Sequence, residues 1–401
     1  MSDIVVIGAG QAGASLVANL RSLGHEGGIT LVGEEPVLPY QRPPLSKKYL
    51  LGEMALERLY LRPESYYAEN DITLLTSHTA VSIDRADRMV VADDRQIHYD
   101  QLALCTGSIP RNLPAAIGGE LANVHTVRTL GDVDAMAPAF TAGTRLLIVG
   151  GGYIGLEAAA VAALRGMKVT LIEMAERILG RVAAPETSDY FRALHQSHGV
   201  DIREHTGLQR LTGQDKVDGA VLSDGTELPA DLVIVGIGIA PATGLAATCG
   251  LEIENGIKTD AKGRTSDAAI WAAGDCASLL RKGERIRLES VQNAIDQAEC
   301  VAANMLGADK DYQPHPWFWS DQYDTKLQIA GLNTGYDRVV TRGAGQAVSF
   351  WYYAGRTLLA VDAMNDARAY MIGKRLIEAG KSPDPAVIAD VEADLKPLLK
   401  S

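Results

Sequence analysis

Two glycine-rich turns, each placed between an apolar strand and a helix, constrain the fold of this chain more than any other feature. The first lies in "IVVIGAGQAGASLVANL" (residues 4–20) and the second in "LLIVGGGYIGLEAA" (residues 146–159). Both have the spacing G-x-G-x-x-G. The first glycine allows a tight turn, the second leaves room for a pyrophosphate, and the third lets the helix pack on the strand. The sequence therefore predicts two dinucleotide-binding βαβ units in one chain.

Each motif is followed by an acid where a ribose-binding residue belongs. The key glycines are Gly8, Gly10 and Gly13 in the first motif and Gly150, Gly152 and Gly155 in the second. Glu34 follows the strand "ITLV", with Glu35 as the second candidate, and Glu173 ends the strand "VTLIE". A carboxylate at Glu173 repels a 2′-phosphate, which favours NADH over NADPH. Arg177 and Arg181 lie downstream and are the residues that would soften this preference.

The remaining pattern predicts the domain organisation. A length of 401 residues indicates two to three domains. We expect an α/β protein with two Rossmann-type dinucleotide-binding domains, arranged as in glutathione reductase, and a smaller C-terminal α+β domain. The expected boundaries are residues 1–109 with 242–314 for the first domain, 110–241 for the second and 315–401 for the third. The third has alternating segments typical of antiparallel strands, followed by a terminal helix.

Charge and cysteine content exclude several classes of function. The net charge of −12 argues against a general nucleic-acid binder. No apolar run reaches the roughly 18 residues of a membrane span, and the N-terminus leads directly into a strand, so we expect a cytoplasmic protein. Four widely spaced cysteines predict no disulfide framework, no metal site and no iron–sulfur cluster of the chain's own.

Several further stretches resemble the FAD-dependent, NADH-linked ferredoxin reductases of the putidaredoxin-reductase type. They are "LPYQRPPLSKKYL" (38–50), "GGGYIGLE" (150–157), "VGIGIAP" (235–241), "AAGDCA" (272–277) and "PWFWSDQYD" (316–324). The resemblance extends over nearly the whole chain. It implies FAD in the first dinucleotide domain and NADH in the second. It also implies transfer of electrons to a [2Fe–2S] ferredoxin that supplies a haem-thiolate monooxygenase.

The resemblance also implies roles for individual residues. Those expected to contact FAD are Ala12, Glu34, Arg42, Pro44, Lys47, Val81, Arg128, Asp275 and Val291. Those expected at the NADH site are Tyr153, Ile154, Glu157, Glu173 and Gly238, with Glu289 near the nicotinamide. As catalytic residues we expect an ion pair of Lys47 with Glu157 beside the flavin, and Trp319 packed close to the isoalloxazine. The helix that begins at Ser290 or Val291 is expected to direct its positive end toward the flavin.

The electron acceptor follows from what the sequence lacks. Without a closely spaced cysteine pair, electrons leave the flavin directly for another protein's cofactor, for oxygen or for a quinone-like molecule. Ferredoxins are usually acidic, so a basic docking face is expected. Arg62 and Lys326 are the candidate docking residues, and ordinary surface charge is the alternative interpretation of each. Three alternative functions stay open: the reductase component of a ring-hydroxylating dioxygenase, an NADH oxidase or rubredoxin reductase, and an NADH-sensing flavoprotein switch.

Overall fold

The apolar strand before each glycine turn lies in the middle of a parallel sheet. In the computed structural model, which describes residues 2–281 and 283–400, β1 (Ile4–Ile7) pairs with β2 (Ile29–Val32) and β7 (Gln101–Leu104). In the same way, β10 (Arg145–Val149) pairs with β11 (Lys168–Ile172) and β16 (Leu232–Val235). All four residues of β1 are buried, as expected for a parallel strand covered on both faces.

The chain forms two units, described one at a time below. Unit 1 consists of the chain up to Gln41, Ala55–Ile109 and Ile239–Pro316. Unit 2 consists of Arg42–Met54, Pro110–Gly238 and the chain from Trp317. Residues 42–54 thus belong to unit 2, although the sequence places them inside the first dinucleotide domain. The predicted division into three domains stays a prediction.

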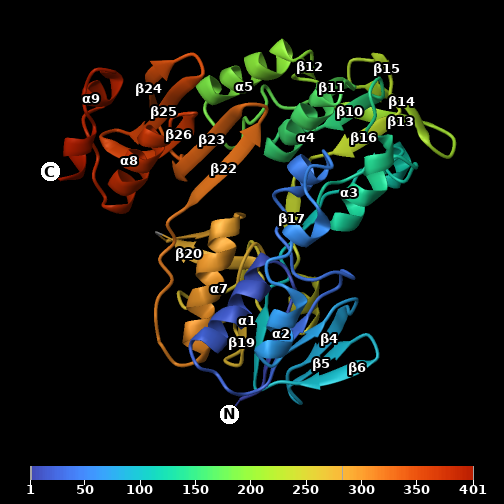
Figure 1. Cartoon of the computed structure of the whole chain (residues 1–401), viewed down its shortest axis with the longest axis vertical. Helices are drawn as coiled ribbons and strands as arrows, with labels where there is room; N and C mark the ends of the chain where they lie inside the picture. Colours follow the sequence, from blue (N-terminus) through green and yellow to red (C-terminus); the bar gives the residue numbers. More distant parts are fainter. Residues whose placement is uncertain (1, 282, 401) are drawn as a thin grey trace. The chain divides into compact units, whose positions relative to one another are not determined.

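Unit 1 is built on a five-stranded parallel sheet of order β19-β7-β1-β2-β3 (Figure 1). Its outer strands are β3 (Ile72–Leu75) and β19 (Ile270–Ala272). Helices α1 (Gln11–Ser22) and α7 (Val291–Met305) lie side by side and share one apolar core with that sheet. The other elements of unit 1 are η2 (Leu56–Arg58), α2 (Glu64–Glu69), β4 (Ala80–Asp84), β5 (Met89–Ala92), β6 (Arg95–His98), β8 (Ser108–Pro110), β17 (Ile239–Pro241), α6 (Gly244–Thr248), β18 (Ile257–Lys258), β20 (Ala277–Arg281) and β21 (Glu284–Ile286).

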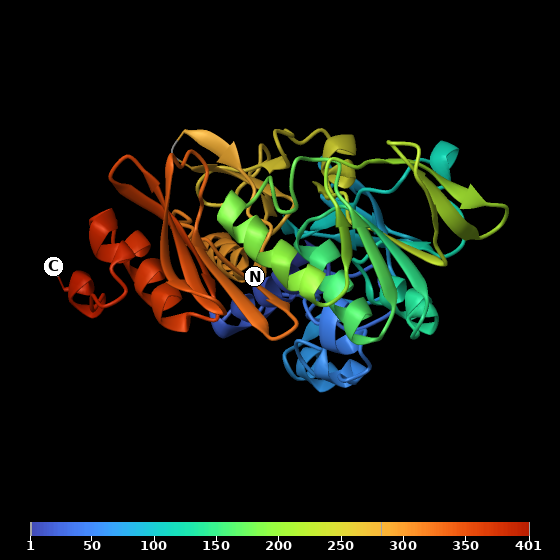
Figure 2. The same cartoon turned by 90° about the horizontal axis from the view of Figure 1, so that it is seen from above.

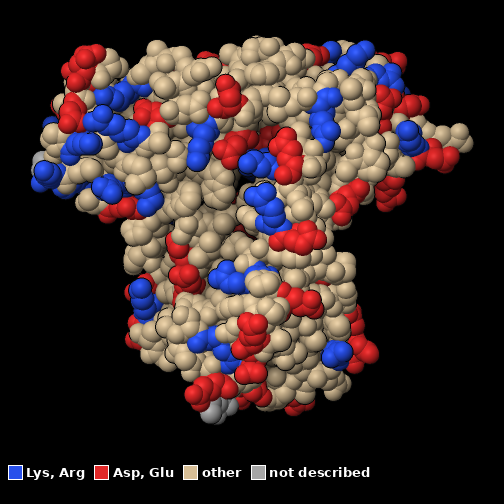
Figure 3. Space-filling view, viewed as in Figure 1, with Lys and Arg blue, Asp and Glu red and all other residues tan. Residues whose placement is uncertain are grey.

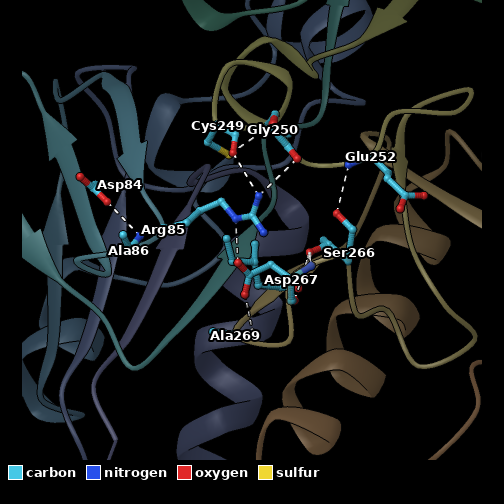
Figure 4. Close-up of polar contacts among 12 residues, drawn as sticks. Asp84, Arg85, Ala86, Cys249, Gly250, Glu252, Ser266, Asp267 and Ala269 are labelled. Carbon is cyan, nitrogen blue, oxygen red and sulfur yellow. Dashed lines mark hydrogen bonds and ion pairs between the residues drawn. The ribbon is translucent and has the colours of Figure 1, made fainter.

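Arg85 fastens the turn after β4 to the segment that leads into β19 (Figure 4). Its Nε donates to Asp267 Oδ2 over 2.7 Å, and its Nη1 donates to the carbonyls of Cys249 and Gly250, each over 3.3 Å. Asp267 in turn accepts from the backbone N–H of Ala269 over 2.9 Å. These contacts join parts of unit 1 that are far apart in sequence, so we interpret this cluster as structural.

The dinucleotide-binding half of unit 2 repeats the architecture of unit 1. Its five-stranded parallel sheet has the order β12-β11-β10-β16-β9, and a three-stranded antiparallel sheet has the order β13-β14-β15. The elements are η1 (Leu45–Tyr49), η3 (Ala115–Ile117), β9 (Val124–His125), α3 (Leu130–Met136), η4 (Ala137–Ala139), α4 (Tyr153–Leu164), α5 (Pro185–Ser197), β12 (Asp201–Arg203), β13 (Leu208–Gly213), β14 (Val217–Leu222) and β15 (Glu227–Pro229).

The rest of unit 2 is an antiparallel sheet of order β22-β23-β26-β25-β24 with helices on it (Figure 2). Its elements are β22 (Trp317–Gln322), β23 (Thr325–Gly331), β24 (Arg338–Ala344), β25 (Ala347–Ala354), β26 (Thr357–Met364), α8 (Ala367–Glu378), α9 (Pro385–Ala389) and η5 (Lys396–Leu399). Successive side chains of β25 point to opposite faces of the sheet, as in any β-strand. Trp351 and Tyr353 pack in one core with α8, whereas the hydroxyl of Tyr352 meets residues at the start of α5.

These observations confirm the predicted fold class: two parallel βαβ sheets and a C-terminal antiparallel sheet with helices. Within the described residues, none of the helices combines the length and apolar character that a membrane crossing requires.

Candidate functional site

The first glycine turn has the geometry that a dinucleotide cradle requires. Gly8 has a φ of +106°, and a Cβ there would lie 2.1 Å from the carbonyl oxygen of Cys105. A Cβ on Gly13 would lie 2.0 Å from Gly8 O, so the helix and strand touch through bare backbone. A Cβ on Gly10 would meet nothing within 4 Å. The turn is therefore packed tightly on its protein side and open at the start of α1.

Three further parts of unit 1 come together at this turn. Gly274 (φ +84°) lies against Ala12, since a Cβ on Gly274 would be 3.0 Å from Ala12 Cβ. Asp275 follows, and its Oδ2 accepts from the hydroxyl of Ser108 over 2.8 Å. Gln297 of α7 accepts from the N–H of Gly274 over 2.9 Å, and so ties this turn to the helix that begins at Val291. Ser108 and Gln297 were missed in the sequence, because neither belongs to a motif.

The other residues predicted for the first site are placed as follows. Glu34 is exposed just beyond β2, and Val81 is an exposed residue of β4. Glu289 lies in unit 1, directly before the N-cap Ser290, and its Oε1 accepts from Arg287 Nη2 over 2.8 Å. The structure thus places Glu289 beside the start of α7, and its predicted role at the nicotinamide stays a prediction.

The second glycine turn has the same pattern of close contacts and open space as the first. Gly150 has a φ of +111°, with its hypothetical Cβ 2.4 Å from Gly236 O. The corresponding distance from Gly155 to Gly150 O is 2.3 Å, and Gly152 again faces open space. The duplicated sequence pattern therefore produces a duplicated cradle, one in each unit.

Glu173 is fixed by the backbone around the second turn. Its Oε2 accepts from Gly151 N over 2.7 Å and its Oε1 accepts from Ala175 N over 2.8 Å. Ile154 is exposed at the start of α4. Gly238 has a φ of +100° and has Arg181 as its nearest side chain, 3.8 Å from its hypothetical Cβ. Arg181 thus lies beside Gly238, and its predicted effect on coenzyme preference stays a prediction.

Tyr153 turns its hydroxyl away from the open side of the turn. The ring lies 5.1 Å from that of Phe318. Within the described residues, its buried hydroxyl has no hydrogen-bond partner. Burial raises the pKa of this phenol well above its ordinary value, and the neighbouring Asp362 and Tyr352 raise it further. Tyr153 is therefore a neutral side chain packed against the C-terminal sheet.

A buried ion pair lies where α4 meets the segment 42–54. Lys47 Nζ is 2.9 Å from Glu157 Oε1, and both side chains are largely buried. Ser46 donates to Glu157 Oε2 over 2.9 Å, and Ser320 of β22 donates to Oε1 over 2.7 Å. Burial raises the pKa of Glu157, whereas Lys47 and the two hydroxyls act in the opposite direction. An ammonium and two hydroxyls on one carboxylate are the donors that an ionised Glu157 needs.

The segment around this pair includes two more predicted residues. Pro44 is the N-cap of η1, and Arg42 Nη1 donates to the carbonyl of Arg128 over 2.6 Å. Trp319 lies on β22, half-buried, with its ring 5.5 Å from that of Trp317. Lys326 is exposed on β23. Arg62, in unit 1, is exposed with its guanidinium 5.5 Å from the ring of Tyr66.

The predicted site residues are thus divided between the two units. Unit 1 holds Gly8, Gly10, Ala12, Gly13, Glu34, Val81, Asp275, Glu289 and Val291. Unit 2 holds Arg42, Pro44, Lys47, Arg128, Gly150, Gly152, Tyr153, Ile154, Gly155, Glu157, Glu173, Gly238 and Trp319. In the part of the chain that the structure describes, no group of His, Cys, Asp and Glu side chains could hold a metal ion.

Comparison with known proteins gives consistent matches along the chain. The family model "Pyridine nucleotide-disulphide oxidoreductase" matches residues 2–298, and the model "Reductase C-terminal" matches residues 317–399. A ferredoxin–NAD(P)(+) reductase of Sphingomonas sp is 44% identical, over 96% of this chain and 95% of that protein.

Two solved structures agree with these matches. In the covalent putidaredoxin reductase–putidaredoxin complex, the similar chain superposes with a TM-score of 0.96 at 40% identity, covering 100% of this chain and 98% of that chain. The ferredoxin reductase for the CYP199A2 system from Rhodopseudomonas palustris gives a TM-score of 0.95 at 40% identity, with 98% and 99% covered.

Proposed function

Since the chain belongs to the pyridine nucleotide-disulphide oxidoreductase family, as an FAD-dependent, NADH-linked ferredoxin reductase of the putidaredoxin-reductase type, we propose that it transfers electrons from NADH to a [2Fe–2S] ferredoxin. We further propose that this ferredoxin supplies a haem-thiolate monooxygenase. The single observation that supports this best is the pair of open glycine cradles, and the buried Lys47–Glu157 ion pair adds to it.

The residues present fit two dinucleotides. Helices α3, α7, α8 and α9 each have a side-chain N-cap. Helices α1 and α4 instead have glycine as the N-cap, so no side chain accepts a hydrogen bond from their first amides. Uncapped amides at a helix N-terminus, next to open space, are the donors that a pyrophosphate accepts. FAD is assigned to the cradle of unit 1, because Asp275 and the start of α7 converge there, and NADH is assigned to the cradle of unit 2.

FAD, when bound, would supply the redox chemistry, namely hydride acceptance from NADH and one-electron release to the acceptor. This chain's residues bind and orient. Glu173 is assigned to the ribose of NADH, Asp275 to the ribityl chain of FAD, and Trp319 to packing on the ring system. Lys47, held by Glu157, is assigned to the flavin edge, where its positive charge favours electron density on the ring.

The cysteines support direct exit of electrons to an external acceptor. All four are free. Burial raises the pKa of Cys105 and of Cys276, so these thiols are poor nucleophiles. A thiol relay of the kind used by disulfide reductases is therefore not part of the proposal. Free thiols also support the proposed cytoplasmic location, because that compartment keeps thiols reduced.

The docking surface for ferredoxin is proposed to be basic. Residues 317–401 contain ten Lys and Arg and ten Asp and Glu, so the net charge of −12 belongs to the rest of the chain. On the face drawn in Figure 3, Lys and Arg gather over the C-terminal domain at the upper left. Lys326 belongs to this less acidic part, and Arg62 is the candidate in unit 1.

Steady-state NADH oxidation with a panel of [2Fe–2S] ferredoxins, with oxygen uptake recorded in parallel, tests the proposal. We expect NADH turnover that depends on a ferredoxin and little oxygen uptake in its absence. Oxygen consumption equal to NADH consumption without any ferredoxin would identify an NADH oxidase. Slow reduction by NADH, with no acceptor accelerating turnover, would instead identify a switch protein.

A further inference from the structure

A row of buried polar side chains extends from the Lys47–Glu157 pair to the surface of unit 2. Ser320 donates to Glu157 Oε1, and Gln322 Nε2 lies 3.1 Å from Ser320 Oγ. Gln322 Oε1 lies 2.8 Å from His195 Nε2, and His195 Nδ1 lies 3.2 Å from the hydroxyl of Tyr323. Ser320, Gln322 and His195 each have 0% exposed surface. Buried polar groups in an unbroken series, with no other use in the site so far, call for an explanation.

The ionised carboxylate of Glu157 fixes the direction of every hydrogen bond in this row. A carboxylate only accepts, so the hydroxyl of Ser320 must donate to it. That hydroxyl has one proton, so toward Gln322 it can only accept, and the amide nitrogen of Gln322 must face it. The amide oxygen then faces His195, which must donate through Nε2–H. The remaining nitrogen of His195, Nδ1, is left as an acceptor for the hydroxyl of Tyr323.

A neutral His195 is needed for this arrangement, and its surroundings favour one. The pKa of His195 is lowered to about 4, chiefly by burial and also by the nearby His198, although Gln322 acts in the opposite direction. His198 stacks on the ring of Tyr323 at 3.7 Å and is exposed. Lys47 is the charged group that acts on Glu157. The row thus has a neutral outer end and a single ion pair at its inner end.

We propose that Ser320, Gln322 and His195 are positioning residues that direct a continuous series of donors at Glu157, keep it ionised, and so hold Lys47 in place. Hydrogen bonds aligned in one direction polarise one another, which strengthens the last bond to the carboxylate. The inference rests on the proposed function only for the role of the ion pair in hydride transfer. The donor direction itself follows from the geometry of this chain.

The first test reads the tautomer of His195 directly. Proton–nitrogen correlation spectra of the FAD-loaded protein with ¹⁵N-histidine identify which ring nitrogen carries the proton, and a His195→Asn variant assigns the signal. We expect Nε2–H with an unprotonated Nδ1 in the wild type, and loss of this single preference in Gln322→Leu. A wild-type His195 protonated on Nδ1 would overturn the proposal.

The second test reads the proton affinity of Glu157 through the pH dependence of flavin reduction by NADH in stopped flow. In Ser320→Ala the acid limb should move to higher pH by about one unit, because a donor to the charged form is lost. In Gln322→Leu it should move in the same direction by less, although Gln322 does not touch Glu157.

Thr325→Val is the matched control. Thr325 lies opposite Gln322 in the β22–β23 register and is equally buried, but it is not part of the row. Its loss should reduce stability and leave the acid limb unmoved. If the acid limbs of the pH profiles of Gln322→Leu and Thr325→Val coincide, the proposal is wrong. Separately, a Glu157→Gln variant whose flavin is reduced by NADH as fast as that of the wild type would refute the proposed role of the ion pair. The tautomer of His195 would still decide whether the donor series exists.

Discussion

At the scale of single residues, backbone groups fix the side chain of Glu173, which is proposed to bind NADH. Glu173 carries a charge at the rim of the second cradle, but both of its oxygens already accept backbone N–H groups. These contacts fix the direction of the carboxylate. The proposed selectivity for NADH would therefore depend on one immobilised carboxylate.

Removing that charge should narrow the preference for NADH over NADPH. In Glu173→Ala we expect the KM for NADH to rise by about threefold to tenfold, the equivalent of one lost hydrogen bond. The ratio of the two kcat/KM values should fall by about tenfold, because the repulsion of a 2′-phosphate disappears. Steady-state kinetics with both coenzymes measure this. Glu176→Ala, at an exposed acid three residues on, is the charge-matched control. A wild-type enzyme that uses both coenzymes equally would contradict the assignment of the second cradle.

At the scale of elements, side chains cap some of the helix starts, and two of these caps, at Ser290 and Asp384, lie in different units. Ser290 caps α7 by accepting from Asn293 N over 3.2 Å, and it directly precedes Val291, a residue expected to contact FAD. Asp384 caps α9 by accepting from Ala386 N over 2.8 Å. The first cap lies beside the proposed FAD site, and the second belongs to the C-terminal helices.

Ser290→Ala should lower the free energy of unfolding by about 0.5–2 kcal/mol, the usual cost of a lost N-cap. It should also speed the loss of FAD on dilution, which fluorescence of the released flavin measures. Asp384→Ala should cost a similar amount of stability without affecting FAD retention. If both variants released FAD at the same rate, the cap of α7 would have no particular relation to the cofactor.

Asp362 on β26 is a buried acid with hydroxyl partners where the sheet meets α5. Burial raises the pKa of Asp362 to about 6, although Tyr352 and Thr187 donate to it and act in the opposite direction. Between about pH 4 and 6 the folded chain holds a proton that the unfolded chain has lost. The contribution of this group to stability is therefore most favourable at low pH and falls as the pH rises to 6.

Replacing Asp362 by Asn should remove this dependence. We expect Asp362→Asn to be more stable than the wild type at pH 7, by about 1–3 kcal/mol, and to keep only about half of that advantage at pH 5. Denaturant unfolding at the two pH values, with FAD in excess, measures the difference. An advantage that is equal at both pH values would show that Asp362 does not titrate in this range.

The helices and strands can be predicted closely from local sequence, whereas the contacts of the candidate site can be predicted only in part. Both cradles are evident from the spacing of Gly8, Gly10 and Gly13 and its repeat, because a turn of six residues is set by its own backbone. The contact of Gln322 with His195 joins residues 127 positions apart. It forms because the C-terminal antiparallel sheet packs against α5. No local pattern distinguishes that histidine from any other. Likewise, Pro44 and Lys47 form a recognisable motif, but its membership of unit 2 comes from tertiary packing alone.

At the scale of the whole molecule, charge is distributed unequally along the chain. The net −12 arises entirely before residue 317. An acidic ferredoxin is therefore repelled by most of the chain and attracted locally, so its orientation on approach depends on a few cations.

Ferredoxin reduction should slow as salt rises, because steering is screened over about 8–10 Å at physiological ionic strength. Ferricyanide reduction by the same enzyme should change far less. Arg62→Glu should raise the KM for ferredoxin and leave flavin reduction by NADH unchanged. The free-energy cost of the reversed charge should exceed the roughly 0.2–1 kcal/mol of one lost surface ion pair. Stopped flow separates the two half-reactions, and Arg95→Glu, also exposed in unit 1, is the control. A slowed NADH half-reaction would move Arg62 from the docking face to the flavin.

The short pairing of β8 with β17 has a consequence for how such chains can be recombined. The two strands are hydrogen-bonded neighbours, and the N–H of Arg111 donates to the carbonyl of Gly238 over 3.0 Å. The entry and exit of residues 110–238 are therefore adjacent, so this stretch can be exchanged as one cassette through two splice points. A cassette from a homologue would bring its own coenzyme cradle and its own counterpart of Glu157. Lys47, Ser320 and Gln322 would stay with the host, whereas His195 would travel with the cassette, so a graft must preserve the contacts to both Glu157 and His195.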